Sequence, residues 1–416
     1  ITAAGAWTVQ TSWDGDASHL GDSSDLIPLS VAPADAALSL DIVVSEAVKI
    51  NSHTPIGGNF SPSPYCDTMN LSGTPIIIHA TEPDGGPTHD LIATTNEYGQ
   101  FLVDYDTALG GGAFAFNELG KWTLWAEYVA TDNIAGVVTE PVTINVIPTA
   151  GYAIVVQGRV ASGEGMPSLH KTATFVYDKL KDRQLLDDDI QYLSWLWHDG
   201  WDGDPSRTNI QDAITEWAPD KMNDQPGDLY IIMVDHGWTA PLDDDEGVFF
   251  IHPDDPITST ELAGWLDELQ GSLAGEAANR NIIIILGFCR AAAFMDQVAG
   301  DNRVVIASAD KDESSHRGPQ DVDAEGQPLR DGEYFVSEFF KSVSYGKSIK
   351  DSFEEATLLT EAFTSTGSGV TNAPFYDDSV QHPLLDDTGD GIGANELSID
   401  AGLDGHISNE LFIGAS

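Results

Sequence analysis

The first third of the chain alternates apolar and polar residues with the period of two that is typical of half-buried β-strands. Clear segments of this kind cover residues 38–44, 75–80 and 99–103. Stretches rich in Gly, Pro, Asn and Asp separate them, as expected for turns. The pattern predicts an all-β domain, a sandwich of antiparallel strands, over residues 34–148.

Part of this pattern occurs twice. Residues 5–9 (Gly-Ala-Trp-Thr-Val) match residues 120–124 (Gly-Lys-Trp-Thr-Leu), an offset of 115 from 5 to 120, and each copy continues into a second alternating strand. Both copies indicate a β-hairpin. The second copy follows the strands of a whole domain, whereas nothing precedes the first. We therefore interpret residues 1–33 as the terminal hairpin of a preceding sandwich repeat.

Such a hairpin needs a sheet to join, because two strands alone are at best marginally stable in water. One hypothesis is strand addition between subunits, which would give self-association and, if the rotation does not close, filaments. The alternative is that a longer precursor was cut before Ile1 and that the hairpin packs on the 34–148 domain. The sequence leaves both open.

From residue 151 the pattern changes to nearly continuous apolar runs, at 153–156, 229–234, 281–286 and 303–307. Runs of this kind are typical of parallel strands that are buried on both faces. Helix-period segments lie between them at 168–184, 206–217 and 259–270, with Ser206 and Ser259 as expected N-caps. We predict a doubly wound, mostly parallel α/β domain over residues 149–416.

Two of these strands run into reactive residues. The run at 229–234 is followed by Asp235-His236-Gly237, and the run at 281–286 by Gly287-Phe288-Cys289. Ligands of doubly wound sheets bind beyond the carboxyl ends of the strands, so a histidine and a cysteine placed there predict a base and a nucleophile. The backbone amides of Gly237 and Cys289 are the expected oxyanion donors.

The region 151–416 resembles the legumain-type cysteine peptidases of the caspase-like clan, in particular their bacterial and archaeal members. The resemblance rests on the opening strand 153–158, the Asp-His-Gly at 235–237, Cys289 and the segment Gln-His-Pro-Leu-Leu-Asp-Asp-Thr-Gly-Asp-Gly at 381–391. It implies a caspase-like fold and a cysteine endopeptidase with His236 as base and Cys289 as nucleophile. It also implies a substrate pocket lined by four residues, which are Ser308, Glu313, Ser314 and Ser315. Residues 1–148 resemble the immunoglobulin-like repeats of large bacterial and archaeal surface proteins.

The chain departs from the family around the cysteine. Gly287 and Phe288 stand where an acidic and a small residue are usual, Ala291-Ala292-Ala293 replaces a small-Gly-small run, and Trp238 replaces a small residue. The alternative hypothesis is therefore a catalytically silent caspase-like scaffold in an adhesive or filament-forming surface protein.

Charge narrows the choice of partners. With 18 Lys+Arg against 67 Asp+Glu, the formal net charge is -49. A protein this acidic is repelled by nucleic acids and anionic membranes, and no apolar run is long enough to span a bilayer. We expect a protein or peptide substrate, no nucleic acid, no membrane insertion and an extracellular or cell-surface location. Ile1 opens without a signal-peptide pattern, which suggests a mature or excised product.

The two cysteines, Cys66 and Cys289, are too few for a disulfide framework. Catalysis by a His/Cys dyad requires no cofactor. Asp386, Thr388 and Asp390 lie at alternate positions before Gly391, which resembles the first half of a calcium loop. A structural calcium ion there is one interpretation, and an Asp- and Gly-rich turn is the other.

Overall fold

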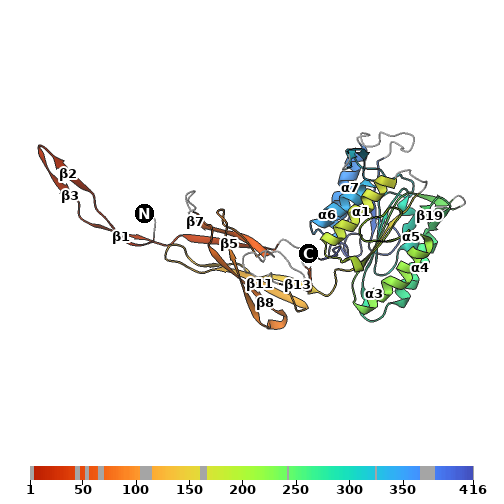
Figure 1. Cartoon of the computed structure of the whole chain (residues 1–416), viewed down its shortest axis with the longest axis horizontal. Helices are drawn as coiled ribbons and strands as arrows, with labels where there is room; N and C mark the ends of the chain where they lie inside the picture. The colour runs from red at the N-terminus through yellow and green to blue at the C-terminus, as the bar shows by residue number, and fades with distance from the viewer. Residues whose placement is uncertain are drawn as a thin grey trace. The chain divides into compact units, whose positions relative to one another are not determined.

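The computed structural model of the 416-residue chain describes residues 4–42, 47–51, 56–63, 70–103, 115–159, 166–240, 243–323, 326–365 and 380–415. The chain divides into two compact units, Ile1–Ile147 and Pro148–Ser416. The first unit is built from β-strands and the second is mixed α/β (Figure 1). Cys66 and the segment 366–379 lie outside the described residues.

Most strands of the first unit form two sheets, with the orders β10-β7-β5 and β6-β13-β11-β8-β9, and β12 pairs with β11. Their side chains share one core, in which Trp122 and Phe116 pack edge to face. Along β11 every second residue is buried, as the period of two predicts. The strands are β5 (Asp35–Ile42), β6 (Ala47–Lys49), β7 (Ile56–Ser63), β8 (Pro75–Thr81), β9 (Thr88–Thr94), β10 (Gln100–Val103), β11 (Gly120–Tyr128), β12 (Val137–Val138) and β13 (Val142–Ile147).

The N-terminal residues form a separate ribbon. β1 (Gly5–Val9) pairs antiparallel with β4 (Ile27–Val31), and β2 (Ser12–Asp16) pairs antiparallel with β3 (His19–Ser23). Both sheets have two strands only, and nearly every residue in them is exposed. The predicted hairpin is therefore present, with its apolar side chains on the surface.

The second unit is built on one sheet with the strand order β16-β15-β14-β17-β21-β22-β25. All its neighbours pair in parallel except β22 and β25. The strands are β14 (Tyr152–Gln157), β15 (Ile190–Ser194), β16 (Trp201–Gly203), β17 (Leu229–Val234), β21 (Ile282–Gly287), β22 (Arg303–Ala307) and β25 (Leu384–Asp386). The prediction of a mostly parallel sheet is confirmed.

Helices cover both faces of this sheet, as a doubly wound fold requires (Figure 1). One face carries α1 (Met166–Asp182), α6 (Tyr334–Ser344) and α7 (Ile349–Ser365). The other carries α2 (Arg207–Asp212), α3 (Ala218–Asp224), α4 (Ser259–Ser272) and α5 (Met295–Val298). The strands β14, β17, β21 and β22 are buried along their whole length because both faces are covered.

The helix caps test two predictions from the sequence. The Ser206 side chain accepts a hydrogen bond from the Asn209 backbone amide at 3.1 Å, so this N-cap is confirmed. The expected cap Ser259 is wrong, because Thr258 caps α4. Its hydroxyl accepts from the Glu261 amide and the Glu261 side chain accepts from the Thr258 amide, which is a capping box.

Several elements of the second unit were not expected from the sequence. The segment after β17 folds into a small antiparallel sheet of β18 (Gly237–Ala240), β19 (Asp243–His252) and β20 (Asp255–Thr258). The motif at 381–391 supplies the edge strand β25, antiparallel to β22. Described helices include none long and apolar enough to cross a membrane.

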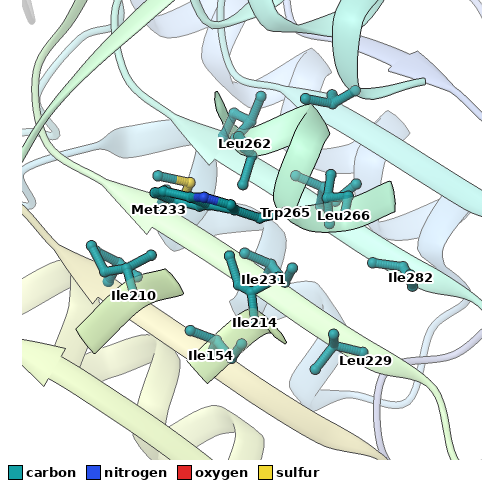
Figure 2. Packing of buried hydrophobic residues seen from close by; sticks show 14 of the residues in the cluster. Ile154, Ile210, Ile214, Leu229, Ile231, Met233, Leu262, Trp265, Leu266 and Ile282 are labelled. Atoms are coloured by element: carbon teal, nitrogen blue, oxygen red, sulfur yellow. The ribbon is translucent and has the colours of Figure 1, made fainter. Parts of the chain in front are cut away.

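A large apolar core lies between the sheet and the α4 face. The α4 side chains Leu262, Trp265 and Leu266 gather beside Ile231 and Met233 of β17 (Figure 2). All five are buried. This core fixes β17, whose carboxyl end leads into the candidate site.

We expect Ile231→Ala to lower the free energy of unfolding by about 2–5 kcal/mol, because it removes buried methylenes and leaves a cavity. Leu358→Ala is the control: this side chain is 68% exposed, and its loss should change stability by less than about 0.5 kcal/mol. Urea unfolding followed by circular dichroism measures both. Equal effects of the two substitutions would contradict the packing.

Candidate active site

The sheet register brings the two reactive residues to one edge. β17 and β21 are neighbours and parallel, and Val234 pairs with Gly287 as the last pair. His236 lies two residues after Val234, and Cys289 lies two residues after Gly287. The two segments therefore leave the sheet at its carboxyl edge and at the same level. This edge lies next to β14, where the strand order reverses and doubly wound folds bind their ligands.

Gly237 lies directly against the cysteine segment. A Cβ atom on Gly237 would lie 2.2 Å from a ring carbon of Phe288 and 2.6 Å from the carbonyl oxygen of Cys289. Neither distance is tolerated, so only glycine fits here. The backbone that follows His236 therefore touches the backbone that carries Cys289.

Phe288 is turned into the core. It is fully buried, with its ring centroid 5.0 Å from that of Phe249 and 5.2 Å from that of Phe294. Trp238 is the second bulky residue that stands where the legumain-type peptidases have a small one. It is half exposed, and the Arg290 guanidinium lies 4.0 Å from its ring centroid. The Phe288 ring thus occupies the interior and not the surface around the thiol.

The Cys289 thiol faces the segment predicted to line the substrate pocket. Its Sγ lies 3.8 Å from the Ser315 hydroxyl and 3.9 Å from the Ser315 carbonyl oxygen. Burial raises the pKa of the Cys289 thiol, the carboxyl of Glu333 adds to this, and hydrogen bonds from Ser315 and Ser314 oppose it. The thiol is therefore protonated at neutral pH and needs a base before it can act as a nucleophile.

Asp235 supports the turn that carries His236. Its carboxylate oxygen Oδ1 accepts the backbone N–H of His236 at 2.5 Å and lies 4.0 Å from the imidazole Nε2. The second distance exceeds a hydrogen bond. Burial raises the pKa of Asp235 well above its usual range.

A buried polar cluster lies behind the cysteine, and we define it as the Gln381 cluster: Ser308, His316, Glu333 and Gln381. The Gln381 side chain donates to the Ser308 carbonyl at 2.6 Å and accepts from the His316 amide at 2.9 Å. Its Nε2 also lies 3.3 Å from Glu333 Oε1. All four residues are buried. One amide side chain thus joins three segments that surround Cys289.

Ser308, predicted to bind substrate, is fully buried at the end of β22. Its backbone amide donates to the Leu286 carbonyl at 2.9 Å, and its hydroxyl donates to the Phe288 carbonyl at 3.4 Å. It therefore contacts the backbone just before Cys289. Ser314 and Ser315 are half-buried.

Glu313, the remaining residue of the predicted pocket, faces the motif at 381–391. Its carboxylate accepts from the His382 amide at 2.7 Å and lies 2.6 Å from His382 Nδ1. This contact with Glu313 raises the pKa of His382. Together with Gln381, the pair attaches the C-terminal motif to the edge of the sheet that carries Cys289.

The Asp386 loop has the geometry of a turn. Asp386 is buried, and its carboxylate accepts from the amides of Thr388, Gly389 and Gly391 at 2.8–3.0 Å. Asp390 accepts the Ile392 amide. No group of three or more His, Cys, Asp or Glu side chains in the described part of the chain is arranged to hold a metal ion. A calcium ion at Asp386, Thr388 and Asp390 stays a prediction.

Sequence reasoning missed Glu333. Burial raises the pKa of this fully buried carboxyl to about 7, against hydrogen bonds from Val336, Gln381 and Ser308 that lower it. It is the N-cap of α6, where its side chain accepts the Val336 amide at 2.5 Å. An acidic residue just before the apolar run of α6 signals a cap, but nothing local signals the electrostatic effect of this carboxyl on the cysteine.

No protein-family model matches the chain, and no curated protein matches it. Among solved structures, the CARDB domain of a Pyrococcus furiosus protein in complex with di-metal ions aligns at 6% identity and a TM-score of 0.17, covering 28% of this chain and 97% of that domain. A family 39 glycoside hydrolase from the gut symbiont Bacteroides cellulosilyticus WH2 aligns at 12% identity and a TM-score of 0.18, over 65% of this chain and 50% of the hydrolase. Likenesses this low assign neither a fold nor an activity.

The buried Glu333 carboxyl predicts a pH-dependent stability. Its pKa is about 7 in the folded protein against 4.5 as the ordinary value, so folding favours the protonated form. The protonated carboxyl therefore contributes its full stabilisation of the fold below pH 4.5, and this contribution is lost as the pH rises through 7. Between pH 4.5 and 8.5 we expect the free energy of unfolding of wild type to fall by roughly 3 kcal/mol more than that of Glu333→Gln.

Urea unfolding at a series of pH values measures the difference. The exposed Glu268 on α4 gives the matched control, because Glu268→Gln should follow wild type at every pH. Parallel pH profiles of wild type and Glu333→Gln would contradict the assignment.

Proposed function

We propose that residues 148–416 form a caspase-like cysteine endopeptidase domain in which His236 and Cys289 act as base and nucleophile. The contact of Gly237 with the Phe288 ring and the Cys289 carbonyl carries the proposal, because it joins the two predicted catalytic segments at one edge of a parallel sheet.

The reaction follows from these roles. His236 takes the proton of the Cys289 thiol, and the sulfur attacks the scissile carbonyl carbon. The carbon–nitrogen bond breaks, the imidazolium gives its proton to the leaving amine, and a thioester remains on Cys289. Water activated by His236 hydrolyses the thioester. In this proposal the amides of Gly237 and Cys289 stabilise the oxyanion, and Ser314 and Ser315 contact the substrate near the thiol.

The substrate of this proposal is a protein or peptide, and no cofactor takes part. The net charge of -49 favours an extracellular or cell-surface location and a substrate without strong negative charge. The β-rich unit, proposed to be immunoglobulin-like, would display the peptidase unit at that surface.

The decisive experiment is labelling with a peptide that carries a thiol-reactive electrophile, combined with a peptide-cleavage assay. Cys289→Ala and His236→Ala should each lower the rate of cleavage by at least about 10³-fold, and the double variant by no more, because the two residues act as one unit. His252→Ala is the matched control and should keep the wild-type rate. Equal labelling of wild type and His236→Ala, with no cleavage by either, would favour the silent scaffold.

Asp235 should matter less than His236. In Asp235→Asn the oxygen that accepts the His236 amide is kept, and the replaced oxygen has no hydrogen-bond partner among the described residues. We therefore expect Asp235→Asn to keep the rate of cleavage within about tenfold of wild type. A loss as large as that of His236→Ala, in a protein with an unchanged circular dichroism spectrum, would instead place Asp235 in a triad.

A further inference from the structure

The N-terminal ribbon repeats the backbone pairing of β11, β12 and β13. β1 pairs with β4 from Gly5 opposite Val31 to Val9 opposite Ile27. β11 pairs with β13 from Gly120 opposite Val146 to Leu124 opposite Val142. Every pair of one ladder becomes a pair of the other when 115 is added to both numbers, the offset from 5 to 120.

Two of the four residue pairs in the outer half of the ribbon follow the same rule. Ser12 opposite Ser23 and Trp13 opposite Asp22 correspond to Glu127 opposite Val138 and Tyr128 opposite Val137. These two pairs correspond although no residue in them is identical between the copies, and only Trp13 and Tyr128 share an aromatic side chain. The correspondence is therefore one of backbone design and extends well beyond the short Gly-x-Trp-Thr match.

The hydrogen bonds between the two halves also correspond. The Ser24 amide donates to the Thr11 carbonyl, and the Thr139 amide donates to the Ala126 carbonyl. In return the Ser24 and Thr139 hydroxyls accept the amides of Thr11 and Ala126, at 3.1 and 2.9 Å. A side-chain hydrogen bond at the same place in both copies makes coincidence an unsatisfactory explanation.

Equivalent side chains differ sharply in exposure. Trp122, Leu124 and Ile144 face the sandwich core and are 0, 0 and 2% exposed, whereas the equivalent Trp7, Val9 and Leu29 are 37, 46 and 40% exposed. The ribbon thus carries the apolar face of a sandwich hairpin without a sandwich core upon it. We define this face as the Trp7 face: Trp7, Val9, Leu29 and Val31.

The complete sandwich shows what the edges of such a hairpin bind. β8 pairs antiparallel with β11 at Thr123 and Leu124, and β6 pairs parallel with β13 at Asn145 and Val146. The equivalent positions on the ribbon are Thr8 and Val9 on β1, and Ser30 and Val31 on β4. In the described residues no strand pairs with these outer edges.

We propose that the ribbon is the closing hairpin of a second sandwich repeat, and that the Trp7 face is covered by the front strands of that repeat. These strands are equivalent to residues 34–115. One of them pairs antiparallel with β1 as β8 does with β11, and one pairs parallel with β4 as β6 does with β13. The order of elements in the complete sandwich places them on the N-terminal side of β1 in the same polypeptide. A second copy of this chain is a poorer occupant, because its β6 and β8 already bind β13 and β11.

A graft tests this proposal. Residues 34–115 are inserted directly before Ile1 of the full chain, so that residue 115 precedes residue 1 just as it precedes residue 116 in the complete sandwich. Backbone amide exchange over residues 5–31 is followed by mass spectrometry. We expect it to slow by at least about tenfold relative to the ungrafted chain, because the ribbon gains strands on both edges and a buried face.

Two controls make the result specific. A graft of residues 34–147 brings its own closing hairpin, so exchange over residues 5–31 should stay as in the ungrafted chain. The 34–115 graft that also carries Val9→Lys and Leu29→Lys should show no slowing of exchange over residues 5–31, since the two lysines place charge in the new core.

Unchanged exchange in the 34–115 graft would overturn the proposal, and so would a grafted segment that stays unfolded. Light scattering on the ungrafted chain adds an independent outcome. A stable dimer whose association is abolished by Val9→Lys would show that the face binds a second copy, and would count against the proposal.

Discussion

The candidate site depends on the requirement that buried polar groups find hydrogen-bond partners. Gln381 meets this requirement for three segments at once, through the Ser308 carbonyl, the His316 amide and the Glu333 carboxyl. Each segment borders Cys289. Loss of this one amide would leave several buried groups without partners, so a residue outside the predicted dyad fixes the surroundings of the thiol.

Local patterning was sufficient to predict most of the scaffold. The apolar runs at 229–234 and 303–307 coincide with β17 and β22, because strands buried on both faces consist almost entirely of apolar residues. The same reasoning failed for β18–β20 and β25. β18, β20 and β25 have only four, four and three residues, and β19 begins with four acidic residues, so none of these sequences shows a strong period. The cap at Thr258 was missed because both it and Ser259 suit the position.

The candidate site was predictable to the extent that it follows from strand ends. Register alone brings His236 and Cys289 to one edge. The inward direction of Phe288 depends on packing against Phe249 of β19 and against Phe294, and the burial of Ser308 goes with hydrogen bonds to Leu286 and Phe288. No local pattern encodes these contacts. Glu333 illustrates the same limit, because a buried carboxyl looks like any helix cap in the sequence. The function inferred from these residues stays a proposal.

The position of the motif 381–391 near the C-terminal end of the sequence affects the order in which the second unit can fold during synthesis. The motif supplies both the edge strand β25 and the amide of Gln381, and it is translated long after His236 and Cys289. A nascent chain that has exposed β17, β21 and β22 therefore still lacks the segment that binds the last strand and satisfies the groups around the thiol. Until the ribosome has released that segment, both reactive side chains are present but their surroundings are unfinished, so the timing of synthesis itself delays the assembly of the site.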